Sequence, residues 1–428
     1  MPILSAMAAA AIAQASLADL SAVEIFALAA AAERGGRYAD AEALYRALAR
    51  DPDLEIRSEA RFRLGVMLSA RTRHADAALV FRELLDEKPG AQRVRLELAR
   101  VLALIGDEAA ARRELRAAQA GGLPPNVAAV VDQFTDALRS RRPYGASISI
   151  ALAPDSNINR ATDAQTLDTI IAPLDLSEDA RERSGVGLKV GAQAFARLRL
   201  APRLSLLPRL SGQSELYREK RFNDVSGSVG LGLELVSGAD RIRPSAGATW
   251  RYYGGDLYAR TQNVSVGWSH PLGRVAQLDT DVSVSRARYL QNPLQNGWIY
   301  DLGASYQRAF DARSGGTLSL SATRQSAEDA GYSTTSGGAT LLGYREFGRT
   351  TAFASAGVRR LVGDERLFLF PEKRREWLLS ASLGATFRAA TVAGFAPLVR
   401  LSFERNASSV GIYDYTRRSA EFGITRAF

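Results

Sequence analysis

Residues 298–310 read Trp-Ile-Tyr-Asp-Leu-Gly-Ala-Ser-Tyr-Gln-Arg-Ala-Phe. The even-numbered positions are mostly apolar or aromatic, and the odd-numbered positions between them are mostly small or polar. This period of two is typical of a β-strand with one apolar face. Aromatic residues stand near both ends of that face, with Trp298 and Tyr300 at one end and Tyr306 and Phe310 at the other. Strands of outer-membrane β-barrels carry aromatic residues at both lipid–water interfaces, so the stretch predicts a membrane-spanning strand.

The same alternation recurs after Pro143, for example in 225–235, 276–284 and 377–387. It predicts fourteen strands for residues 143–428, and an even number is expected of a single-chain bacterial barrel. Their ranges are approximately 144–152, 185–198, 203–215, 225–236, 241–253, 261–270, 276–289, 298–310, 316–325, 335–347, 351–361, 376–389, 395–405 and 416–428. The predicted fold of this part is a 14-stranded antiparallel transmembrane β-barrel.

The connections between these strands alternate in length. Those after even-numbered strands have about three to six residues, and those after odd-numbered strands have about seven to over thirty. Short periplasmic turns and long external loops are characteristic of barrels in the outer membrane of Gram-negative bacteria, where we expect this chain. The last strand ends in Phe428, and a terminal aromatic residue resembles the signal read by the barrel-assembly machinery.

The first third of the chain has helical rather than strand periodicity, from Ser21 to about Arg139. Similar residues recur 34 positions apart, which is the period of tetratricopeptide repeats. These pairs are Leu64 and Leu98, Gly65 and Ala99, Leu68 and Leu102, Ala77 and Ala111, Phe81 and Leu115, and Leu84 and Ala118. About three repeats are enough to share a continuous core. We therefore predict a periplasmic α-helical tetratricopeptide solenoid in 16–142 and an α + β multidomain chain.

Residues 1–15 form a short apolar stretch that ends in small residues, as a secretory signal peptide does. The positively charged region expected before it is missing, because the first Arg is Arg34. Either the true start lies upstream, or the stretch is the front of a helix. We favour a signal peptide, because the barrel must be exported.

Composition excludes several classes of chemistry. The chain has no Cys and two His, and this leaves no thiol catalysis, disulfides or Cys-ligated zinc and little histidine chemistry. We expect His74 and His270 to be turn residues, and Asp279 and Asp281 to line a polar barrel interior rather than to act as a catalytic pair. The prediction is therefore no enzyme, no cofactor and no metal.

The net charge of +9 comes mainly from residues 143–428, which hold 35 Lys and Arg against 27 Asp and Glu. No basic helix or aromatic RNA-binding motif accompanies this excess, so we expect no nucleic-acid partner. Basic residues in one long loop, Arg366 and 373–375, favour contact with anionic lipopolysaccharide.

Two segments carry a family resemblance. One is Pro154-Asp155-Ser156-Asn157-Ile158-Asn159-Arg160 at the start of the longest loop; the other runs from Asn406 through Tyr413, Tyr415 and Arg417 to Phe428. With a repeat domain before a fourteen-stranded barrel, the chain resembles the Slam family, the surface lipoprotein assembly modulators. The residues so marked are Pro154, Asp155, Ser156, Asn157, Asn159, Arg160, Asn406, Tyr413, Tyr415 and Arg417.

The resemblance implies a translocator that moves a lipoprotein, or a secreted haem- or metal-binding protein, across the outer membrane. A periplasmic chaperone would supply this cargo. The alternative is a porin that exports polysaccharide, because such exporters also join periplasmic repeats to a barrel. The lumen positions are mostly Ser, Gly, Thr and Gln with scattered Arg and Asp, and they do not distinguish the two functions.

Overall fold

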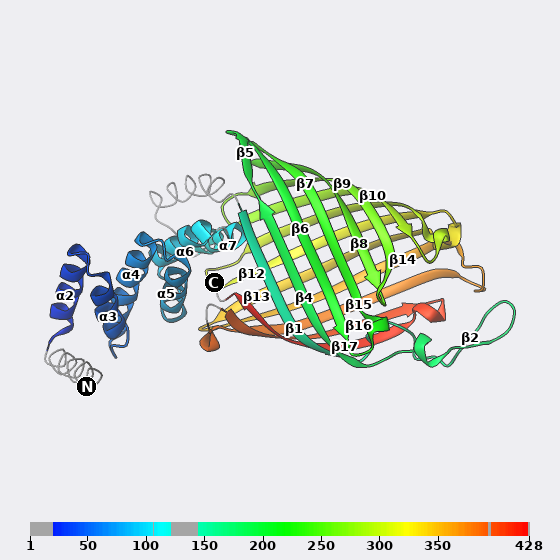
Figure 1. Cartoon of the computed structure of the whole chain (residues 1–428), viewed down its shortest axis with the longest axis horizontal. Coiled ribbons are helices and arrows are strands. Elements are labelled where there is room, and N and C mark those ends of the chain that lie inside the picture. The colour runs from blue at the N-terminus through cyan, green and yellow to red at the C-terminus, as the bar shows by residue number, and fades with distance from the viewer. Residues whose placement is uncertain (1–19, 106, 121–143, 393–394, 427–428) are drawn as a thin grey trace. The chain divides into compact units, whose positions relative to one another are not determined.

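A computed structural model describes residues 20–105, 107–120, 144–392 and 395–426. The chain forms two compact units, an N-terminal helical unit and a C-terminal β-barrel (Figure 1). Within the described ranges, every helix is too short or too polar to cross a membrane. Two predictions, the signal peptide at 1–15 and the role of Phe428, fall outside these residues.

The described part of the helical unit contains six helices. They are α2 (Ala22–Arg34), α3 (Tyr38–Leu48), α4 (Leu54–Ala70), α5 (His74–Glu87), α6 (Gln92–Ile105) and α7 (Glu108–Ala120). Ser21 and Glu24 form a capping box at the start of α2, because each side chain pairs with the other residue's backbone N–H. Asp53 caps α4 by accepting the N–H groups of Glu55 and Ile56.

The residues that recur 34 positions apart form the core of this unit. All ten Leu, Ala and Phe residues of the five apolar pairs are at most 2% exposed. Gly65 permits close helix packing, because a Cβ atom there would lie 2.4 Å from the Phe81 ring. Helical periodicity is confirmed, whereas the assignment of these helices to tetratricopeptide repeats stays a prediction.

One buried ion cluster adds to this core. Glu114 accepts hydrogen bonds from Arg82 at 2.6 Å and from Arg95 at 2.5 Å. Burial raises the pKa of the Glu114 carboxyl, but the charges and hydrogen bonds of both arginines outweigh burial and lower it to about 2.

The barrel strands are consecutive antiparallel neighbours. They are β1 (Tyr144–Asp155), β4 (Gly185–Ala196), β5 (Leu198–Ala201), β6 (Leu204–Tyr217), β7 (Asp224–Ser237), β8 (Asp240–Tyr253), β9 (Asp256–Leu272), β10 (Ala276–Tyr289), β11 (Gly297–Ala309), β12 (Ser314–Ala327), β13 (Thr334–Phe347), β14 (Thr350–Arg366), β15 (Lys373–Phe387), β16 (Phe395–Ser408) and β17 (Tyr415–Arg426). Because β4 and β5 both pair with β6, they count as one barrel strand and the described total is fourteen. Pairing of β17 with β1 closes the ring and confirms the predicted fold (Figure 1).

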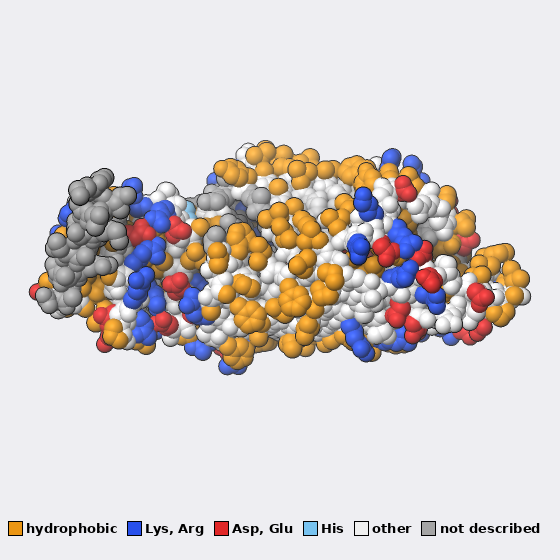
Figure 2. All heavy atoms as spheres, turned by 60° about the horizontal axis from the view of Figure 1, so that its bottom comes forward, with side chains coloured by type: hydrophobic (Ala, Val, Ile, Leu, Met, Phe, Trp, Pro, Cys, Tyr) orange, Lys and Arg blue, Asp and Glu red, His pale blue; other side chains and the backbone are white. Residues whose placement is uncertain are grey.

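Side-chain alternation separates a lipid face from the lumen. Large apolar side chains on one face of each strand are exposed, as with Val229 and Leu231 of β7, Leu302 of β11 and Leu379 of β15. We call the end of the barrel that carries the long segment after β1 the loop end. Figure 2 shows hydrophobic side chains across this outer face and charged ones gathered toward the loop end. The opposite positions line the lumen with hydroxyl pairs such as Ser245 and Ser265, whose oxygens lie 2.7 Å apart.

Lumen-facing charges are held by polar partners. Asp279 accepts hydrogen bonds from Gln277 at 2.7 Å and from Gln307 at 3.3 Å, in agreement with the predicted lumen position. Glu234 is buried between Arg197 at 3.3 Å and Arg243 at 3.2 Å. The interior is thus polar and carries charges of both signs.

The predicted loop lengths are wrong, and the long segment after β1 is the main difference between the two ends of the barrel. Apart from the long segment after β1, the connections at the loop end contain two to seven residues, because the strands continue further than expected. In four of these loops, a polar side chain near the end of the loop accepts a hydrogen bond from the backbone N–H of the last residue of the preceding strand. The acceptors are Asn223, Asn296, Ser333 and Asp414, and the donors are Tyr217, Tyr289, Ala327 and Ser408.

Three of the four two-residue turns between strands, those after β7, β8 and β13, use glycine. Gly238 and Gly348 have φ values of +56° and +53°, which residues with a side chain adopt only with strain. The turn after β9 begins at Gly273, with φ +70°, so the strand continues through His270 and Pro271 to Leu272. The predicted turn position of His270 is therefore wrong. Its Nδ1 lies 2.7 Å from Asp240 Oδ1, and its ring stacks on Trp268.

Candidate functional site at the β1–β17 seam

Over the described residues, the closing seam of the barrel is paired at fewer positions than the interfaces beside it. β1 pairs with β4 at every residue from Tyr144 to Asp155, and β16 pairs with β17 continuously from Phe395 to Asn406. Across the seam, the described residues pair at 150–152 with 422–424 and again at Asp155 with Ser419. The interruption includes Pro154, which has no backbone N–H to donate to the ladder.

A buried ion pair closes the seam at its loop end. Arg417 Nε donates to Asp155 Oδ2 at 2.8 Å, and Arg417 Nη2 donates to the same oxygen. The Asp155 side chain is 0% exposed and the Arg417 side chain 5%. Glu404 of β16 extends the cluster, with its carboxylate 3.5 Å from Arg417 Nη1 and 3.5 Å from Arg160 Nε.

The first loop begins with residues that tie it back to both strands. Ser156 N donates to Arg418 O at 2.9 Å, and Ser156 Oγ accepts the Arg418 N–H at 2.9 Å. Asn157 is fully buried; its backbone N–H donates to Asp155 Oδ1 at 2.9 Å, and its amide donates to Thr416 O at 3.1 Å. The segment therefore crosslinks β1 to β17 through side chains as well as backbone.

The same loop is fixed to its own returning end. Asn159 donates to Arg181 O at 2.7 Å and accepts the Arg183 N–H at 3.1 Å. Arg160 has a φ of +49°, a left-handed conformation that turns the chain directly after Asn159. These contacts place the Arg160 side chain near Glu404.

The second motif segment forms the last loop and the start of β17. Asn406 donates to Tyr413 O at 2.6 Å, and Tyr415 Oη donates to Glu404 Oε2 at 3.5 Å. Asp414 accepts hydrogen bonds from Arg405 Nη2 and from the Ser408 N–H, both at 3.1 Å. The two segments are thus parts of one polar cluster, although more than 200 residues separate them in sequence.

The structure brings together all ten residues of the two motif segments at one end of the seam. Sequence reasoning missed Glu404, which links Arg160, Tyr415 and Arg417. Its position two residues before Asn406, and hence on the same strand face, is the signal that could have found it.

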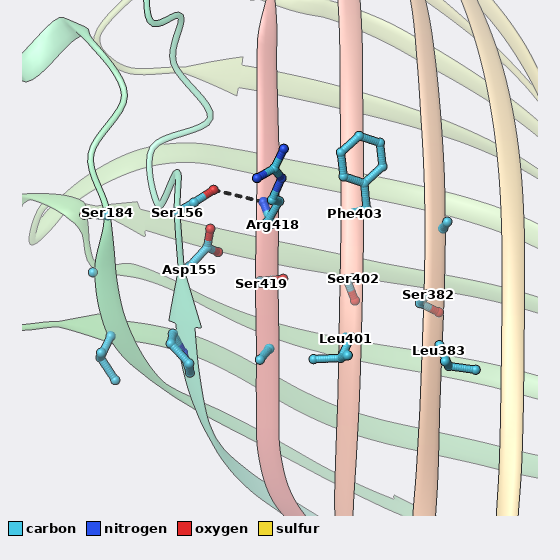
Figure 3. A pocket seen from close by; sticks show the side chains of 15 residues that line it. Asp155, Ser156, Ser184, Ser382, Leu383, Leu401, Ser402, Phe403, Arg418 and Ser419 are labelled. Carbon is cyan, nitrogen blue, oxygen red and sulfur yellow. Dashed lines mark hydrogen bonds between the residues drawn. The ribbon is translucent and has the colours of Figure 1, made fainter.

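A groove lies beside this cluster on the lipid face. It has a volume of about 890 Å³, and its lining includes Pro154, Val186, Leu383, Leu401, Phe403 and Ala420. We call it the seam groove. Figure 3 shows the labelled lining residues from the end of β1 across β17, β16 and β15, with the hydrogen bond between Ser156 and Arg418 at the upper rim. The described residues hold no cluster of three or more Asp, Glu, His or Cys side chains placed to bind a metal ion.

Comparison with known proteins identifies the family. Residues 145–428, the whole barrel with both motif segments, match the model of the surface lipoprotein assembly modifier family. The chain belongs to this family. It is 25% identical over 384 residues to surface lipoprotein assembly modifier 1 of Neisseria meningitidis serogroup B, an alignment covering 85% of this chain and 75% of that protein. It is 23% identical over 236 residues to the surface lipoprotein assembly modifier of Moraxella catarrhalis, covering 53% and 44%.

Solved outer-membrane barrels resemble this family member only weakly. A bacterial polysaccharide outer membrane secretin has 10% identity and a TM-score of 0.35, covering 66% of this chain and 98% of that chain. The toluene transporter TodX of Pseudomonas putida has 9% identity and a TM-score of 0.37, covering 69% and 91%. Structural similarity at this level supports no conclusion about function.

Proposed function

We propose that this chain is an outer-membrane translocator that delivers a partner lipoprotein, or a secreted haem- or metal-binding protein, to the cell surface. The family match over the whole barrel carries the proposal, because the relatives are named for the assembly of surface lipoproteins. The polar lumen and the closed fourteen-stranded wall suit passage of a polypeptide rather than catalysis.

We also propose an orientation for the chain. The end with the long first loop faces outward and the opposite end faces the periplasm, as in other outer-membrane barrels. Residues 1–15 would then direct export, and the helical domain within 16–142 would receive cargo from a periplasmic chaperone. The barrel-assembly machinery would insert 143–428, and basic loop residues would contact lipopolysaccharide.

The polysaccharide exporter remains the alternative function. The described lumen positions carry hydroxyl pairs and ion pairs of both signs, such as Glu234 with Arg197 and Arg243. This lining favours neither a sugar nor a polypeptide. The family match favours protein cargo.

The test is export of a candidate cargo. Cells would express this chain together with the lipoprotein encoded beside its gene, and surface cargo would be measured by protease accessibility on intact cells. We expect surface cargo only when the chain is present, and much less when residues 16–140 are deleted although the barrel still inserts. Equal surface display without the chain would refute the proposal. Loss of an extracellular polysaccharide on deletion of the gene would support the exporter instead.

A further inference from the structure

Over the described residues, the β1–β17 seam is the strand interface with the fewest paired positions in the barrel wall. Between 150–152 and Asp155 the ladder is interrupted at 153–154, whereas β1–β4 and β16–β17 are continuous over the same depth. Unpaired backbone groups at membrane depth are costly, and this is why natural barrels close completely. The interruption of the closing interface at 153–154 therefore needs an explanation.

Side chains as well as backbone groups hold the loop end of this seam. The Asp155–Arg417 ion pair joins β1 to β17, and Ser156 exchanges two hydrogen bonds with Arg418. We call these contacts the latch. Ion pairs and hydroxyl contacts re-form without a change of strand register, so the latch can hold the seam shut and still permit it to open.

The seam groove lies directly outside this interface. Pro154 and Val186 line it from the β1 side, and Leu401, Phe403 and Leu383 line it from the β16 and β15 side. The small side chain of Ala420 on β17, between them, leaves the floor of the groove open. A group that leaves the lumen between β1 and β17 therefore enters an apolar channel open to lipid without crossing another strand (Figure 3).

We propose that the β1–β17 seam is a lateral exit, through which the acyl anchor of a lipoprotein cargo passes from the barrel into the seam groove and then into the lipid. The inference rests on the proposed function, because it assigns a route to that cargo. The groove fits an acyl chain rather than a peptide or sugar, since its exposed large side chains, Val186, Leu383, Leu401 and Phe403, are apolar. Small serines line the rest of it, and its exposed charge, Arg418, stands at the outer rim.

The first test locks the seam with a disulfide in a chain that has no native cysteine. Leu152→Cys with Phe422→Cys bridges β1 to β17, because these residues are directly opposed across the seam. The matched control, Leu152→Cys with Leu188→Cys, bridges β1 to β4 and keeps one of the two substitutions. Each variant would be compared oxidised and reduced, with heat-modifiable gel mobility to verify folding.

Oxidation should lower surface display of the acylated cargo by roughly tenfold or more in the seam variant, because a covalently closed barrel gives an acyl chain no lateral path. The reductant should restore display, and the control bridge should leave it unchanged. Equal display by both oxidised variants, or a folded seam variant that forms no disulfide, would overturn the inference. If the unbridged chain exports no cargo, the proposed function itself fails.

The second test examines the groove directly. A photoreactive p-benzoyl-phenylalanine would replace Leu401 in the groove or, as a control, Leu302 on β11, on the far side of the ring by strand order. The two leucines are 54% and 55% exposed, so both face lipid equally. We expect light to crosslink acylated cargo from position 401 alone, and crosslinks of equal yield at both positions would contradict docking in the groove.

Discussion

The latch contacts allow the loss of barrel stability to be predicted for two substitutions. In Asp155→Asn, the buried Arg417 keeps Glu404 at 3.5 Å, so its charge stays partly compensated. In Arg417→Met, two carboxylates lose a cation, and Glu404 keeps the Arg160 contact and the Tyr415 hydrogen bond, both at 3.5 Å. Breaking a buried pair costs about 3–5 kcal/mol. We therefore expect a loss of about 3 kcal/mol for Asp155→Asn and about 5 kcal/mol for Arg417→Met.

Urea unfolding of the barrel refolded in lipid vesicles, followed by Trp fluorescence, would measure both losses. All four Trp residues lie within 143–428, so the signal reports the barrel. The double variant should lose about 5 kcal/mol rather than the sum, because the two side chains act as one unit. A control pair, Arg251 with Asp224, is 46% and 31% exposed and should cost below about 1 kcal/mol when Asp224→Asn breaks it. Additive losses, or an equal cost for the control, would refute the latch.

Three further predictions follow from other parts of the chain. Gly65→Ala places a Cβ 2.4 Å from the Phe81 ring and should destabilise the helical unit by about 1–3 kcal/mol in thermal circular dichroism, whereas Gly90→Ala, with no atom within 4 Å, should not. The pKa of Glu114 falls from 4.5 to about 2 on folding, so its ion pairs stabilise the helices fully above about pH 4.5 and are lost as the pH falls toward 2. In an acid titration of unfolding, Glu114→Gln should remove this pH dependence of stability. On intact cells an impermeant maleimide should label Phe368→Cys, at a loop position 80% exposed, and spare Ala239→Cys in an exposed turn at the other end; the reverse labelling would show that the orientation is inverted.

Local sequence patterns predict the elements of this fold well because each follows from one periodicity. Alternation with period two marks the fourteen strands, and residues recurring every 34 positions mark a buried helical core that includes Leu98 and Phe81. Strand ends were less predictable. β9 continues through Pro271, because proline at the end of a strand is tolerated where the turn begins later, at Gly273.

The site was predictable as two segments but not as one cluster. Asp155 and Arg417 are 262 residues apart, and no local pattern pairs them. Only the rule that the last strand of a barrel meets the first brings their neighbourhoods together. The contribution of Glu404 depends on which side chains point to one another across three strands, and a period of two cannot specify that.

The polar lumen is the reason that a seam able to open would help an acylated cargo to cross. An acyl chain drawn through a channel lined by Ser245, Ser265 and ion-paired Glu234 would lose its lipid surroundings along the whole path. Each methylene group costs about 0.8 kcal/mol on leaving lipid for water, so a long chain costs of order 10 kcal/mol. A wall that opens at one seam removes most of this barrier, since the polypeptide stays in the lumen while its anchor stays in the groove. Such a seam needs contacts that re-form in register after each passage, and the contacts of Asp155 with Arg417 and of Ser156 with Arg418 meet that requirement.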